Sequence, residues 1–233
     1  MNKKSHSPQA PDQQIATAPI DVDTKEFATW SGQVGAPPPN ELMPAAIAQL
    51  TVLHAYQNSR SQDWNTCGQA AMATMLDFQG RDPFSLSRPK LGVDGKQHWD
   101  DGEIIDALIS AGYGPDVVFG LGSTGGRVRD AVQNYGLMAE VGWSGAFSGG
   151  WQDQWRTLRA YVELGRPVPV CVDLGALGGA WYTAHWAIAY RIENGTVHLG
   201  NCPMSQVPEG QFLHAWNCWF LPIGFNHCGV YVS

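Results

Sequence analysis

Apolar residues recur every three or four positions up to about residue 165 and form continuous apolar runs beyond it. The first pattern predicts helices over residues 42–56, 67–76, 100–112 and 128–135, and another around 155–165. Asn65 or Thr66 is a suitable N-cap for the second helix, whose Ala and Met residues favour helix. Cys67 is therefore expected in the first turn of a helix.

Beyond residue 165 the apolar runs predict strands at 168–173, 185–192, 196–199, 212–221 and 229–232. Asn194-Gly195 lies between the second and third of these, and an Asn-Gly pair is a strong hairpin signal because its backbone tolerates positive φ. Helices first and antiparallel strands later predict an α+β fold, with an N-terminal helical lobe packed on a C-terminal antiparallel sheet.

Residues 1–42 differ in composition from the rest of the chain. They contain Ser, Gln, Pro, Asp and Lys with few large apolar side chains, and they end near Pro37-Pro38-Pro39. Such a segment is expected to be a flexible, proline-rich tail. The remaining residues, 43–233, are predicted to form one domain, because the chain as a whole is 44% hydrophobic and only 15% charged, against about 25% charged residues in an average soluble domain.

Charge and hydropathy argue against two classes of partner. The chain has 14 basic and 21 acidic residues and no basic run longer than Lys3-Lys4, so it has little with which to neutralise a phosphate backbone, and no nucleic-acid partner is expected. No stretch of about 18 apolar residues is present, and no signal-peptide core follows the first residues. We expect synthesis in the cytoplasm and no membrane partner; any export would use a specialised secretion system.

The five cysteines are an odd number without the spacing of a disulfide framework. They are Cys67, Cys171, Cys202, Cys218 and Cys228, and most are predicted to be free thiols that pack as small apolar residues. A zinc site from Cys202, Cys218, His227 and Cys228 lacks the paired short spacings of structural zinc sites. No metal and no organic cofactor is predicted.

Cys67 is the candidate nucleophile. The N–H groups and the positive dipole end at a helix start stabilise a thiolate. Gly68 would let a substrate backbone approach closely, and the polar run at 57–63 would turn this end of the helix towards a cleft. The alternative is a structural cysteine that faces the interior with Ala71 and Met75.

Three segments resemble the papain-like cysteine peptidases. They are Asn65-Thr66-Cys67-Gly68-Gln69-Ala70-Ala71 at a helix start, Gly165-Arg166-Pro167-Val168-Pro169-Val170, and Ala184-His185-Trp186-Ala187-Ile188-Ala189-Tyr190. The order of the motifs is most similar to the bacterial branch that contains the double-glycine leader peptidases of bacteriocin exporters, and the resemblance covers about residues 57 to 203. It implies a papain-like two-lobe fold and a thiol protease.

The resemblance also implies roles for individual residues. Cys67 would be the nucleophile, His185 the base, and Asn201 the residue that orients the imidazole. Many members of the bacterial branch have Asp at this third position, whereas an Asn there resembles papain. A side-chain amide upstream would complete the oxyanion hole; Gln62 is the candidate, five residues before Cys67, with Gln57 as the alternative. Removing Gln62 is expected to impair turnover without abolishing it.

The pairing of His185 with Asn201 depends on strand register. With a regular two-residue loop at Asn194-Gly195, Glu193 would pair with Thr196, and His185 and Asn201 would point to opposite faces. A three-residue loop, or an equivalent bulge, would place the two residues diagonally on one face. We therefore predict such a loop or bulge, because a regular two-residue turn would count against Asn201.

The expected function is hydrolysis of a peptide bond in a protein or peptide substrate through a thioester. The missing signal peptide and the tail suggest a secreted bacterial effector or toxin, which would have an immunity or inhibitor protein as a partner. Two alternatives remain open: a deamidase or transamidase that uses the same triad, and a non-catalytic papain-like module that binds peptides.

Overall fold

The computed structural model describes residues 65–81, 90–91, 97–98, 101–117, 122–144, 150–179, 184–220, 223–224 and 226–233. All of them belong to one compact unit, Gly35–Ser233. The predicted tail at 1–42 and the predicted helix at 42–56 lie outside the described residues.

Helices and an antiparallel sheet make up the described part of the chain, which confirms the α+β class. The helices are α3 (Cys67–Phe78), α4 (Asp101–Leu108), α5 (Gly125–Asn134), α6 (Trp151–Glu163) and α7 (Glu209–Trp216), and a π-helical segment, η2 (Ile109–Tyr113), continues α4. The main sheet has the order β3-β10-β4-β5-β6-β7, with β3 (Ala139–Gly142), β4 (Val168–Asp173), β5 (Ala184–Glu193), β6 (Thr196–Gly200), β7 (Gln206–Pro208) and β10 (Gly229–Val232). Two small antiparallel pairs are β1 (Lys90–Leu91) with β2 (Gln97–His98), and β8 (Trp219–Phe220) with β9 (Ile223–Gly224).

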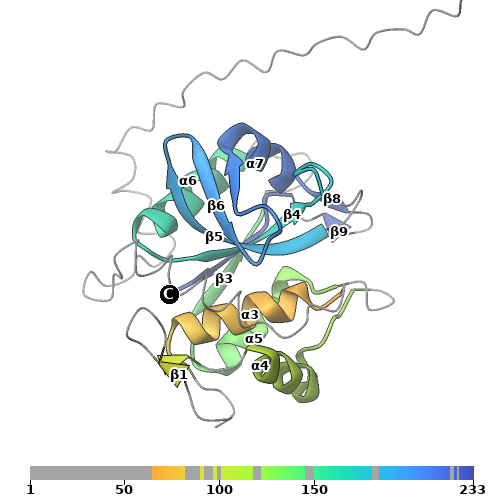
Figure 1. Ribbon diagram of the computed structural model, residues 1–233. Helices are drawn as coiled ribbons and strands as arrows, with labels where there is room; N and C mark the ends of the chain where they lie inside the picture. The colour runs from red at the N-terminus through yellow and green to blue at the C-terminus, as the bar shows by residue number, and fades with distance from the viewer. Residues whose placement is uncertain are drawn as a thin grey trace, which may run out of the picture. The chain divides into compact units, whose positions relative to one another are not determined.

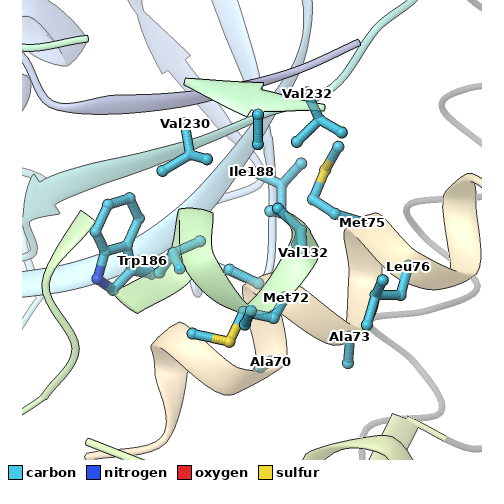
Figure 2. Packing of buried hydrophobic residues seen from close by; sticks show 14 of the residues in the cluster. Ala70, Met72, Ala73, Met75, Leu76, Val132, Trp186, Ile188, Val230 and Val232 are labelled. Carbon is cyan, nitrogen blue, oxygen red and sulfur yellow. The ribbon is translucent and has the colours of Figure 1, made fainter. Parts of the chain in front are cut away.

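Helices cover both faces of the main sheet (Figure 1). On one face, α3 packs against β4 and β5, while α5 packs against β3 and β10. Figure 2 shows the core there, where Met75 of α3 approaches Ile188 of β5 and Val232 of β10. These side chains are almost completely buried, and their removal from water stabilises the contact between helix and sheet. The core therefore fixes α3, the helix that begins with Cys67, against β5, the strand that carries His185.

On the opposite face lie α6 and α7, which contact β4 and its neighbours. Three aromatic side chains join these helices: the Phe212 ring stacks on Trp216 at 5.6 Å, and Trp155 lies 5.9 Å from Phe212. The sheet is thus enclosed by helices on both faces. The helix predicted around 155–165 is present as α6, and it lies with α7 on the face opposite α3 and α5.

The predicted strand at 212–221 is wrong over residues 212–216, which belong to α7, and among its described residues only Trp219–Phe220 form a strand, β8. Pro208 precedes the helix and Glu209 lies in its first turn, where an acidic side chain is favourable. Phe212, Ala215 and Trp216 have the i, i+3, i+4 spacing of a helix face, and all three are fully buried. Aromatic residues favour strands by propensity, but the spacing of those in this segment is that of a helix face.

The hairpin turn also differs from the prediction, although the register does not. Glu193 pairs with Thr196, so Asn194 and Gly195 form a two-residue loop, with φ of 50° and 72°. The pairing then shifts by one residue between Ala189 and Arg191, which is a β-bulge. The predicted three-residue loop is therefore wrong, while the predicted equivalent, a bulge, is present.

Replacing Phe212 with Ala should destabilise the protein by about 3–5 kcal/mol, because it removes a fully buried ring between Trp155 and Trp216. His214→Ala, at an exposed position of the same helix, is the control and should change stability by less than about 0.5 kcal/mol. Urea unfolding measures both. Equal effects of the two substitutions would contradict the packing of α7.

Candidate active site

Cys67 is the first residue of α3 and is 7% exposed. Its sulfur receives backbone hydrogen bonds from Trp186, Gly68 and Cys67 itself, which lower the pKa of the thiol. Burial acts in the opposite direction and is the larger effect, so the pKa of Cys67 is raised above its ordinary value of 9.0. The helix start supplies the expected donors, but they do not ionise the thiol by themselves.

Trp186 provides two backbone groups to the site because β6 ends short of it. The last pair between β5 and β6 is Ile188 with Gly200. Cys171, the β4 partner of Trp186, donates its N–H to the carbonyl of Cys228, the residue before β10, at 3.1 Å, so the Trp186 backbone groups point away from β4. They point to the side where Cys67 lies.

Asn201 follows β6 and connects the two elements of the site. Its Nδ2 donates to the Trp186 carbonyl at 2.9 Å and lies 3.4 Å from the Cys67 carbonyl oxygen. The residue is 2% exposed and has a φ of 52°, a left-handed conformation that Asn tolerates better than most residues. The Asn201 side chain therefore ties the start of α3 to β5.

His185 is hydrogen-bonded through Nε2 to the main-chain carbonyl of Asn201. The resemblance implied that Asn201 orients the imidazole, and the atom that does so here is this carbonyl. Because a carbonyl oxygen only accepts, Nε2 carries the proton and Nδ1 retains the basic lone pair. Burial lowers the pKa of His185 from 6.5, and the bond to Asn201 partly opposes that shift.

The fold thus gathers three predicted residues from α3, β5 and the turn after β6. Cys67 and Asn201 are 134 positions apart in the chain. The β-bulge puts Asn201 on the side of the hairpin that His185 occupies, as the register argument required. Gln62 and Gln57 lie outside the described residues, so the oxyanion donor stays a prediction.

The expectation for Gly68 is corrected by the structure. A Cβ built on Gly68 would lie 2.6 Å from Cβ of Ser123, so a side chain of the protein itself occupies the space beside this glycine. Position 68 therefore requires a glycine because Ser123 of the same chain lies against it, and not because a substrate does. Sequence reasoning missed Ser123, and its one indirect signal was the polar Gln69 within an apolar helix, which needs a hydrogen-bonding partner.

No group of three or more His, Cys, Asp or Glu side chains suited to a metal ion occurs among the described residues. Cys202, Cys218, His227 and Cys228 are therefore not gathered as ligands. Across the same residues, none of the helices combines the length and the hydropathy needed to span a bilayer.

No family model and no curated protein sequence matches this chain. Among solved structures, it is similar to the peptidase domain of Streptococcus ComA, described as a bi-functional ABC transporter involved in quorum sensing. The two chains are 14% identical with a TM-score of 0.47, and the match covers 75% of this chain and 96% of that domain.

The alkylation of Cys67 by iodoacetamide should show two pH limbs. Below pH 6.5 the rate should fall as His185 becomes protonated and loses its basic lone pair, with an apparent pKa under 6.5 because burial lowers it. Above pH 9 the rate should rise as the Cys67 thiol ionises directly. His185→Ala should abolish the plateau at neutral pH and keep only the alkaline rise. Peptide mapping of alkylated protein measures the rates.

The other thiols provide an internal control for this experiment. Burial raises the pKa of Cys228 to about 12, and a hydrogen bond to Cys218 together with burial holds the pKa of Cys171 well above 9.0. Cys67 should react faster than both at neutral pH, because His185 is available as a base. Equal rates for the three cysteines would contradict the arrangement.

Replacing Asn201 with Gly and with Ala should separate its two contributions. Both substitutions remove the amide that joins Cys67 to Trp186, so both should slow Cys67 alkylation to a similar extent. Only Ala is strained at a φ of 52°, so Asn201→Ala should be less stable than Asn201→Gly by about 1 kcal/mol. Unfolding in urea gives the stability difference. Wild-type alkylation in Asn201→Gly would show that the amide does not position Cys67.

Proposed function

We propose that this protein is a cysteine peptidase that cleaves a peptide bond through a thioester on Cys67. The observation that carries the proposal is the convergence of a thiol, an imidazole whose Nε2 is bonded to a main-chain carbonyl, and an amide that joins their two elements, all of them buried. Nucleophilic catalysis by cysteine needs a sulfur, a base and a residue that orients the base, and a helix start favours the thiolate.

The resting pair is proposed to be neutral. Burial favours the uncharged form of both partners, since it raises the pKa of the Cys67 thiol and lowers that of the His185 imidazole. The thiolate is then generated as the substrate is attacked. The negative charge that develops on the substrate carbonyl oxygen and the positive charge on the His185 imidazolium would then stabilise each other in this dry environment.

In the first half-reaction, the Cys67 thiol transfers its proton to Nδ1 of His185 while the sulfur attacks the carbonyl carbon. The oxyanion would be stabilised by the Cys67 N–H at the helix start, and Gln62 is the candidate for a second donor. As the C–N bond breaks, the imidazolium gives its proton to the leaving amine, and a thioester remains on the sulfur.

In the second half-reaction, His185 removes a proton from water, and the hydroxide adds to the thioester carbon. The C–S bond then breaks, the carboxylic acid leaves, and the proton returns to the sulfur. Throughout, the Nε2–H bond to the Asn201 carbonyl holds the ring in one tautomer and is strengthened when the ring is positively charged.

Comparison of the wild type with Cys67→Ala on a bacterial or eukaryotic proteome tests the proposal. The wild type should generate new peptide termini, and loss of the nucleophile should reduce their rate of formation by at least about 10³-fold. His185→Ala should act similarly. Cys218→Ala, which removes another buried thiol, is the matched control and should retain activity. N-terminal labelling with mass spectrometry counts the termini.

Two outcomes would contradict peptide-bond cleavage. If wild type and Cys67→Ala yield the same termini, the protein is not a peptidase that uses this cysteine. If Cys67 is required but the substrates change only in the mass of a Gln side chain, the thioester is formed on a side-chain amide and the protein is a deamidase or transamidase.

A further inference from the structure

Ser123 lies between the two elements that carry the candidate nucleophile and base. Gln69, in the first turn of α3, donates from Nε2 to Oγ of Ser123 at 2.9 Å. The indole N–H of Trp186, in β5, donates to the Ser123 carbonyl at 2.8 Å. Ser123, two residues before the start of α5, is therefore held by both α3 and β5, and we refer to Gln69, Ser123 and Trp186 as the clasp.

The packing at Gly68 makes the clasp tight. A Cβ on Gly68 would lie 2.6 Å from Cβ and 2.7 Å from Oγ of Ser123, distances at which atoms overlap. The same Cβ would be 3.5 Å from the Trp186 indole. Ser123 and the indole thus lie directly against the first turn of α3, one residue from the sulfur of Cys67.

Gln69 is a polar side chain buried in the apolar interface of α3. Its side chain is completely buried, and Nε2 also donates to the Tyr113 carbonyl at 2.7 Å, in η2. That carbonyl accepts only, so the amide must be oriented with nitrogen towards it, and Oε1 is left without a partner among the described residues. A buried acceptor without a partner costs about 1–3 kcal/mol. The two hydrogen bonds from Nε2, to Tyr113 and to Ser123, therefore fix the Gln69 side chain in one orientation.

The three contacts of Trp186 connect the clasp to the site. Its backbone N–H bonds to the Cys67 sulfur, its carbonyl accepts from Asn201, and its indole is fixed by Ser123. A shift of Ser123 therefore moves the residue that follows His185 relative to α3.

We infer that Gln69 and Ser123 are positioning residues, which hold Trp186 and thereby keep His185 in register with the Cys67 thiol. The inference rests on the proposed function, since it assumes that Cys67 and His185 react together. Neither residue contacts the reacting atoms. Their effect would be on geometry, to which a proton transfer between two side chains is very sensitive.

Iodoacetamide alkylation of Cys67 in the full chain tests the inference. Ser123→Ala keeps the Cβ contact with Gly68 but removes Oγ, and it should lower the alkylation rate at neutral pH about tenfold. The remaining rate should lose its acid limb, because the reaction no longer proceeds through His185. Thr157→Val is the matched control: it removes a buried hydroxyl in α6 that donates to the Asp153 carbonyl at 2.8 Å. Thr157→Val should destabilise the protein about as much as Ser123→Ala does, but it should leave the alkylation rate of Cys67 and its acid limb unchanged.

A steric pair strengthens the test. Gly68→Ala alone should displace Ser123 and reduce alkylation more than Ser123→Ala does, because of the overlap at 2.6 Å. Adding Ser123→Gly removes the opposing atoms and should restore the rate to that of Ser123→Ala. If Ser123→Ala does not fold, Gln69→Met, which has a similar volume and no donor, takes its place with the same expected loss.

The outcomes separate the two proposals. A wild-type rate and acid limb in a folded Ser123→Ala or Gln69→Met protein would overturn the inference and leave the proposed function intact, and so would an equal loss of rate in Thr157→Val. If Cys67 in the wild type reacts no faster than in His185→Ala, the proposed function itself is wrong, and the inference falls with it.

Discussion

The backbone of Trp186 is the interaction on which the candidate site depends. A strand residue normally gives its N–H and C=O to the neighbouring strand. Because β6 ends at Gly200, these groups of Trp186 are available for Cys67 and Asn201 instead. Because β6 ends early, backbone groups that would pair in the sheet instead link the start of α3 to Trp186, the residue after His185.

The electrostatics of the site follow from its burial. Backbone donors at the start of α3 favour the thiolate, but the loss of water around Cys67 outweighs them. The same loss of water keeps His185 neutral. An enzyme of this kind would not hold a standing ion pair, and its reactivity would depend on how well the imidazole is placed to receive the proton. The bonds of the Asn201 amide to Trp186 and Cys67 are of the neutral kind, which fix position without supplying charge.

Several features were predictable from the sequence because they are local. The position of Cys67 at a helix start follows from the Ala- and Met-rich segment behind it, and Asn194-Gly195 identified the hairpin. The strand prediction fails at α7 because its aromatic residues have a high strand propensity, whereas their spacing is that of a helix face. Strand β3, four residues long, has no pattern of its own and exists because it pairs with β10.

The contacts that place the site could not be predicted, because they join distant parts of the chain. Nothing near Ser123 in the sequence indicates that it fills the space beside Gly68. The acceptor for His185 is a main-chain carbonyl, which any residue could supply, so residue type carries no information about it. Parity along the hairpin did show that a register shift was needed, but its location at Tyr190 depends on packing in the sheet.

That register shift has a consequence for how the hairpin tolerates changes in length. The bulge lies between the loop and the site, so it absorbs the one-residue offset that a two-residue loop would otherwise impose on Asn201. Deleting one residue between 190 and 194 is therefore compatible with the site only if the bulge is lost with it. A change of one residue on each strand would leave His185 and Asn201 on the same face of the hairpin. Related chains with longer or shorter hairpins should differ by an even number of residues. Where the difference is odd, a bulge should be gained or lost as well.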